Sequence, residues 1–142
     1  MMKRRRLTTI AVVPIAAALT GSLNLSAQAA PLETKENDEG AVMASVTPLD
    51  LSKTADAWRF AVQFNTHVTP ISQDMVAVAS LNGSKDVEER PTAWEGDPPG
   101  GHHRRGVLAF QPMNPAPSTV TLHIRDVGGV ADRAFTWDLG GS

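Results

Sequence analysis

The feature that most constrains this chain is a strict alternation of side-chain type between residues 58 and 65. Every second residue is large and apolar, namely Trp58, Phe60, Val62 and Phe64. Successive side chains of a β-strand point to opposite faces, so a period of two places this row on the buried face of a sheet. The segment therefore predicts a half-buried strand and favours an all-β fold.

Similar segments recur along the chain and are separated by turn residues. Strands are expected over residues 41–51, 58–65, 75–81, 87–94, 106–110, 120–125 and 135–139. Asn82-Gly83, a proline-rich stretch over 111–118 and Gly128-Gly129 mark the connections. Seven short strands without a convincing helix predict an antiparallel β-sandwich of the immunoglobulin or fibronectin III kind. The missing Cys…Trp…Cys signature argues against a true immunoglobulin domain.

Residues 1–29 have the composition of a secretory signal peptide. A basic stretch at 3–6, an apolar run over 7–19 and the small-x-small sequence Ala27-Gln28-Ala29 follow one another. The apolar run is shorter than the roughly 20 residues that a membrane-spanning helix needs. We therefore expect a periplasmic or secreted protein with no membrane span after cleavage. An acidic flexible leader over 30–40 would precede one β-sandwich domain over 41–142.

The charge balance and the missing motifs exclude several classes of function. All 15 acidic residues follow residue 29, but only nine of the 13 lysines and arginines do, which gives a net charge of −6 after cleavage with neutral histidines. An acidic surface repels phosphate groups, so nucleic acid is not an expected partner. The chain has no cysteine or tyrosine, no Gly-x-Ser-x-Gly elbow and no phosphate-binding loop. We therefore expect that it is not an enzyme.

The most unusual stretch runs from Trp94 to Arg105 and contains two acids, two prolines, three glycines, two histidines and two arginines. Gly100-Gly101 permits backbone angles that other residues resist, and Pro98-Pro99 stiffens the approach. If successive strands run in opposite directions, this loop and the turn after residue 65 lie at the same end of the sandwich. Six polar residues would then gather there, namely His67, Asp74, Asp97, His102, His103 and Asp126.

The first functional hypothesis is a transition-metal site at this end. Imidazole nitrogens with a carboxylate nearby suit zinc and copper, so the candidate ligands are His67, His102, His103, Asp74 and Asp97. Adjacent histidines in an extended segment point to opposite sides, so only one of the pair would bind. The spacing matches no standard zinc motif. The alternative is that these histidines are ordinary exposed loop residues.

The second hypothesis makes the same loop a contact surface for a protein or for the cell envelope. Arg104 and Arg105 follow the Gly100-Gly101 amides and would hold a carboxylate or phosphate, with Trp94 beside them. The alternative is that both arginines pair with local acids, in which case each surface pair contributes roughly 0–1 kcal/mol and no function.

The sequence of this loop also resembles that of a known group of proteins. The motif Trp94-x-Gly96-x-Pro98-Pro99-Gly100-Gly101-His102-His103-Arg104-x-Gly106-x-Leu108-x-Phe110, with Thr66-His67 before it and Phe135-x-Trp137 after it, resembles a group of small exported bacterial β-sandwich proteins with no assigned activity. The resemblance covers most of the mature chain. It implies a β-sandwich and an exported location, and it carries over no site residue.

Overall fold

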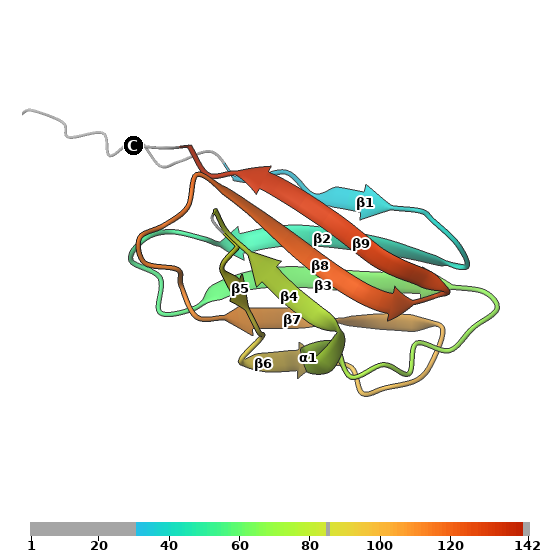
Figure 1. Ribbon diagram of the computed structural model, residues 1–142. Helices are drawn as coiled ribbons and strands as arrows, with labels where there is room; N and C mark the ends of the chain where they lie inside the picture. Colours follow the sequence, from blue (N-terminus) through green and yellow to red (C-terminus); the bar gives the residue numbers. More distant parts are fainter. Residues whose placement is uncertain (1–30, 85, 141–142) are drawn as a thin grey trace, which may run out of the picture.

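The computed structural model describes residues 31–84 and 86–140, so the expected signal peptide lies outside the described residues. These residues form antiparallel strands in two sheets, as the alternation predicted, but they contain nine strands instead of seven (Figure 1). The elements are β1 (Lys35–Asn37), β2 (Val42–Asp50), β3 (Trp58–Thr66), α1 (Met75–Val78), β4 (Ala79–Asn82), β5 (Glu88–Glu89), β6 (Ala93–Gly96), β7 (His103–Phe110), β8 (Thr119–Val127) and β9 (Val130–Asp138). The strand order is β1-β2-β3-β7-β6 in one sheet and β5-β4-β8-β9 in the other.

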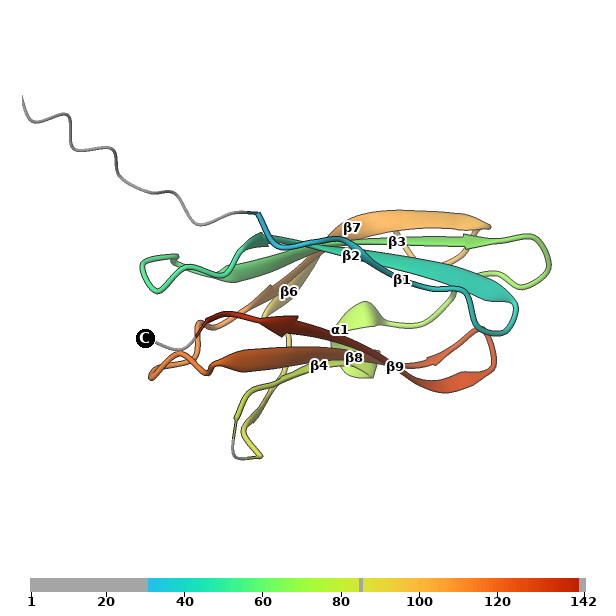
Figure 2. The same ribbon diagram turned by 90° about the horizontal axis from the view of Figure 1, so that it is seen from above.

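The two sheets lie face to face as two layers around one hydrophobic core (Figure 2). The predicted apolar row of β3 is fully buried in this core. Its Phe60 ring packs edge-on against Phe110 of the same sheet, with 5.7 Å between the ring centroids, and lies 5.5 Å from Trp137 of the other sheet. Burial of large side chains contributes about 1.5–3 kcal/mol each, so this row is a principal source of stability.

The segment expected as one strand over 75–81 begins instead with a single helical turn, α1. The Asp74 carboxylate accepts a hydrogen bond from the backbone N–H of Val76 at 3.0 Å and caps this turn. An N-terminal cap of this kind satisfies an otherwise free amide and favours helix over strand. The strand β4 then starts at Ala79, four residues later than expected.

The expected hairpin partner over 87–94 is divided between the two sheets. The short β5 pairs with β4, and the Gly83 amide donates to the Val87 carbonyl at 3.1 Å to close the turn. The strand β6 then pairs with β7 in the opposite sheet. Pro91 lies between the two strands and has no N–H for a strand ladder, so the chain crosses between the layers at this point.

Part of the segment predicted as an acidic flexible leader over 30–40 forms a strand. Its residues 35–37 form β1 and pair with β2, with Glu36 opposite Ser45. The Trp137 indole N–H also donates to the Glu33 carbonyl at 2.8 Å. Backbone carbonyls accept hydrogen bonds whatever the side chain is, so the polar composition of this segment did not reveal its attachment.

No helix in the described part of the chain is long and apolar enough to cross a membrane.

Candidate functional site

Three connections meet at one end of the two sheets, which we call the loop end and define by residues 67–74, 97–102 and 126–129. The Thr66 amide donates to the His102 carbonyl at 2.9 Å. Ile71 exchanges two backbone hydrogen bonds with the glycine pair, to Gly101 at 3.1 Å and from Gly100 at 2.8 Å. The Gln73 side chain reaches the Asp126 carbonyl at 2.8 Å. The expected gathering of these segments at one end is therefore confirmed.

The glycine pair adopts backbone angles of the kind that the sequence indicated. Gly100 and Gly101 have φ angles of 109° and 76°, a region that favours glycine. With this backbone the 97–102 loop folds back so that its amide and carbonyl groups meet Ile71. The pair therefore joins the two loops through the backbone.

The carboxylates of the predicted metal set have structural partners. Asp74 caps α1, and the Asp97 carboxylate accepts from the Arg105 amide at 2.9 Å. His103 is hydrogen-bonded through Nδ1 to the Asn65 side-chain oxygen at 2.7 Å, and His67 and His102 are exposed. Within residues 31–84 and 86–140, no three His, Asp or Glu side chains lie in a group that could hold a metal ion.

Arg104 was expected to contact an anion but is 1 % exposed and faces the interior. Its guanidinium donates to three backbone carbonyls, those of Ile71 at 3.1 Å, Gln73 at 2.5 Å and Asp97 at 3.3 Å. Burial lowers the pKa of Arg104 below its ordinary value, and the nearby carboxylates of Asp74 and Asp97 oppose that shift. Arg104 is therefore an internal cation that links two loops, and it is not available to an external ligand.

Trp94 is likewise a packing residue. Its indole N–H donates to the Asp97 carbonyl at 2.9 Å, and its ring lies under the Arg104 guanidinium. A methyl group on Gly106 would come within 2.5–2.8 Å of three ring atoms of Trp94, so only glycine lets the ring lie flat on β7. The indole and the guanidinium together fix the start of the loop.

A second buried arginine, Arg133, was not anticipated. It donates to the Asn37 carbonyl and side-chain oxygens, to the Glu39 carbonyl at 2.8 Å and to the Val127 carbonyl at 3.1 Å. Burial lowers its pKa as well, against the opposing charges of Glu39 and Asp38. Arg133 ties the N-terminal segment to the β8–β9 turn, which is at the loop end.

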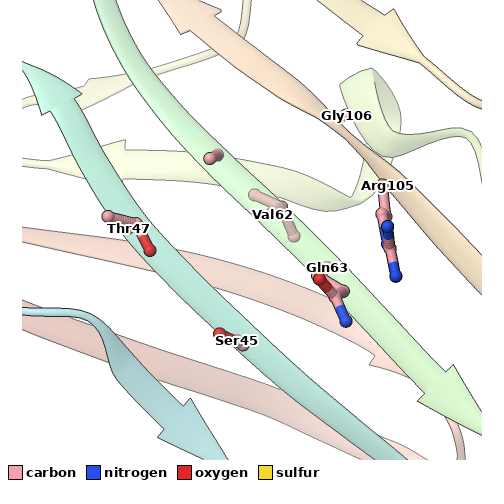
Figure 3. Close-up of a pocket in the computed structure, with 7 residues that line it drawn as sticks. Ser45, Thr47, Val62, Gln63, Arg105 and Gly106 are labelled. Atoms are coloured by element: carbon pink, nitrogen blue, oxygen red, sulfur yellow. The ribbon is translucent and has the colours of Figure 1, made fainter.

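Arg105 is the one member of the predicted anion-binding set that is exposed. It lies on the outer face of the five-stranded sheet, the face turned away from the other sheet. Its cross-strand neighbour is Gln63, which in turn lies opposite Ser45, so the three side chains form a row over β7, β3 and β2 (Figure 3). The guanidinium of Arg105 has no hydrogen-bond or ion-pair partner among the described residues.

This row borders a shallow depression of about 190 Å³, which we call the outer-face depression. Its lining residues are Ser45, Thr47, Ala61, Val62, Gln63, Arg105 and Gly106. Ser45, Thr47 and Ala61 have small side chains, so they leave the face low at this point. The Arg59–Glu95 ion pair, 2.9 Å long, lies beside them: Glu95 shares the cross-strand row of Thr47 and Ala61, and Arg59 lies in the next row of the face. The Ser45 hydroxyl and the Gln63 amide have no hydrogen-bond partner within the described chain, so the row offers three polar groups to a ligand.

Scans of the chain against protein-family profiles, curated proteins and solved structures found no match.

Proposed function

We propose that this chain is an exported, non-enzymatic module with an immunoglobulin- or fibronectin III-like sandwich, which binds a carboxylate-bearing segment of a partner protein on the outer face of its five-stranded sheet. The two antiparallel sheets around one core support the sandwich class. Export rests on the signal-like sequence of residues 1–29.

The exposed guanidinium of Arg105, which has no partner within residues 31–84 and 86–140 and lies beside the outer-face depression, is the observation that carries this proposal. Arginine binds a carboxylate through two parallel hydrogen bonds, and a hydrogen bond to a charged group contributes about 1.5–3 kcal/mol. The Gln63 amide and the Ser45 hydroxyl extend the same row and would bind neighbouring polar groups of the ligand. The site would therefore select a carboxylate that is followed by hydrogen-bonding groups.

The residues that line the depression are consistent with binding and do not form a catalytic group. Its hydroxyl groups belong to Ser45 and Thr47, and none of the lining residues is a histidine, aspartate or glutamate that could act as a base. A serine or threonine hydroxyl needs such a base to act as a nucleophile. The proposal therefore assigns recognition, and no reaction, to this face.

Isothermal titration calorimetry with a glutamate-rich peptide tests the proposal. We expect Arg105→Gln to weaken binding at least tenfold. Arg59→Gln is the matched control, because Arg59 lies on the same face but is already paired with Glu95. Binding should fall as salt rises from about 50 to about 500 mM. The acidic chain also attracts a lysine-rich peptide, but its affinity should be the same for wild type and Arg105→Gln. Equal affinities of wild type and Arg105→Gln for the glutamate-rich peptide would refute the site.

Transition-metal binding at the loop end is a second, separate candidate. It is favoured by the Thr66–His102 backbone hydrogen bond, which brings the loop of His67 next to His102 and His103. Zinc or copper should then raise the melting temperature of the protein by mass action. The rise should be lost in His67→Ala and in the His102→Ala/His103→Ala double variant. A melting temperature unchanged by either metal would refute this candidate.

A further inference from the structure

The edges of the two sheets differ greatly in length. The strands β1, β5 and β6 at three of the edges have three, two and four residues, whereas β9 at the fourth edge has nine. β9 pairs with β8 along its length, and no strand of the described chain pairs with its other side. Natural sheets keep their edge strands short because a long free edge offers a template for another strand. β9 is the exception in this fold.

The N-terminal segment lies near β9 but does not pair with its backbone. It is held by Arg133 and Trp137, two buried side chains of β9 that reach Asn37 and Glu33. β1 itself belongs to the other layer (Figure 2). The segment therefore belongs to the five-stranded sheet through β1 and contacts β9 through side chains, and no strand within residues 31–84 and 86–140 extends the four-stranded sheet beyond β9.

We propose that β9 pairs with β9 of a second copy, antiparallel, about a twofold axis at Ala134. The exposed side chains Asp132, Ala134, Thr136 and Asp138 alternate along the strand on the outer face. In a pair centred on Ala134, Asp132 lies opposite Thr136 of the second copy. A pair centred one residue later, on Phe135, would place Asp132 opposite Asp138. Like charges directly opposite each other are unfavourable, so the charges of the strand disfavour the Phe135-centred register. Ala134 is the midpoint of Val130–Asp138, so a pair centred there includes the whole strand.

A second copy suits this edge for reasons of length and chemistry. Both partners offer the same nine-residue strand, so all of the free edge can be paired. No lysine or proline lies on β9 to block the approach, and its arginine points inward and is already hydrogen-bonded. The result is a continuous eight-stranded sheet. The outer-face depression lies on the other sheet, so each dimer would carry two copies of it.

Disulfide trapping tests this pairing directly, because the chain contains no cysteine of its own. Directly opposed residues of two antiparallel strands have Cα atoms about 4.5–5.5 Å apart, within the range that a disulfide spans. We expect Ala134→Cys to form covalent dimers under mild oxidation. Ala131→Cys is the matched control, since the two copies of residue 131 would lie roughly 20 Å apart at about 3.4 Å per residue. Equal trapping of both variants, or trapping of neither, would overturn the proposal.

Sedimentation velocity on two lysine variants gives an independent test without a cross-link. Ala134→Lys places two like charges together at the axis, and the dimer dissociation constant should rise about fivefold. Thr136→Lys places a lysine opposite Asp132, and the constant should fall by a similar factor. Both positions are exposed, so circular dichroism should show unchanged folding. The β9 interface would be refuted if the wild-type protein stays monomeric up to millimolar concentration. It would also be refuted if the protein dimerises but neither substitution changes the dimer dissociation constant.

Discussion

The guanidinium carbon of Arg104 lies 5.4 Å from the centre of the Trp94 ring. Trp94 belongs to β6 and Arg104 to β7, so this cation–π contact closes the two ends of the Trp94–Arg105 loop on each other. Such contacts are worth about 0.5–2 kcal/mol, the larger value applying to desolvated cations. Since the same guanidinium also holds the 67–74 loop, it supports much of the loop end.

Replacing Arg104 should therefore destabilise the protein without any ligand being present. Arg104→Met would leave the Gln73 carbonyl without a donor and would remove one of the two donors to each of the Ile71 and Asp97 carbonyls. The cost should be about 1–3 kcal/mol, and the melting temperature should fall by on the order of 10 °C. Arg104→Lys should recover only part of this loss, because an ammonium group lacks the planar fork of donors. Thermal unfolding followed by circular dichroism measures both effects. A melting temperature equal to that of wild type in Arg104→Met would show that the guanidinium has no structural role.

Gly106→Ala should destabilise the fold through overpacking. The added methyl group would meet the Trp94 ring at 2.5–2.8 Å, and strain of this kind costs about 1–3 kcal/mol. Urea unfolding of Gly106→Ala, Trp94→Leu and the double variant forms a mutant cycle. We expect the two changes to be less than additive, because a leucine side chain is smaller than the indole and relieves the clash. Full additivity would mean that the two residues do not interact.

The N-terminal segment should be part of the cooperative fold. Asn37→Ala removes a half-buried acceptor of the buried Arg133 and should lower the free energy of unfolding by about 1–3 kcal/mol. Glu36→Ala on the same strand is the control, because the Glu36 side chain is exposed and has no hydrogen-bond partner in the described structure. Hydrogen exchange should show protection at residues 35–37 that Asn37→Ala reduces. If the amides of residues 35–37 in the wild type exchange as fast as those of a free peptide, the segment is a flexible leader and is not part of the cooperative fold.

The β class and the position of the loop end could be predicted from the sequence, because both depend on alternation and on the direction of strands. Trp58, Phe60, Val62 and Phe64 point inward as expected. The loops that contain His67 and His102 lie at the same end because β3 and β7 run antiparallel, and this was the only relationship that the prediction required. That relationship holds even though the intervening segment forms α1, β5 and β6 instead of a simple hairpin.

The structural roles of Arg104 and Arg133 were harder to predict from the sequence, although the sequence contains a signal that both side chains are buried. Arg104 shares its parity with the buried Leu108 and Phe110, and Arg133 shares its parity with Phe135 and Trp137. Alternation alone therefore places both arginines on the inner face. Buried arginines are rare unless paired, and their partners here are backbone carbonyls from distant segments, which no sequence pattern records. The outer-face depression also depends on cross-strand neighbours, which are known only once the register is fixed.

Amide chemical shifts during titration with a glutamate-rich peptide test the central claim most directly. We predict that the backbone amides of Ser45, Gln63 and Arg105 shift progressively, that those of His67 and His102 do not, and that Arg105→Gln abolishes the shifts. Shifts confined to the loop end, or shifts over β2, β3 and β7 that persist in Arg105→Gln, would contradict the assignment of this face as the binding site.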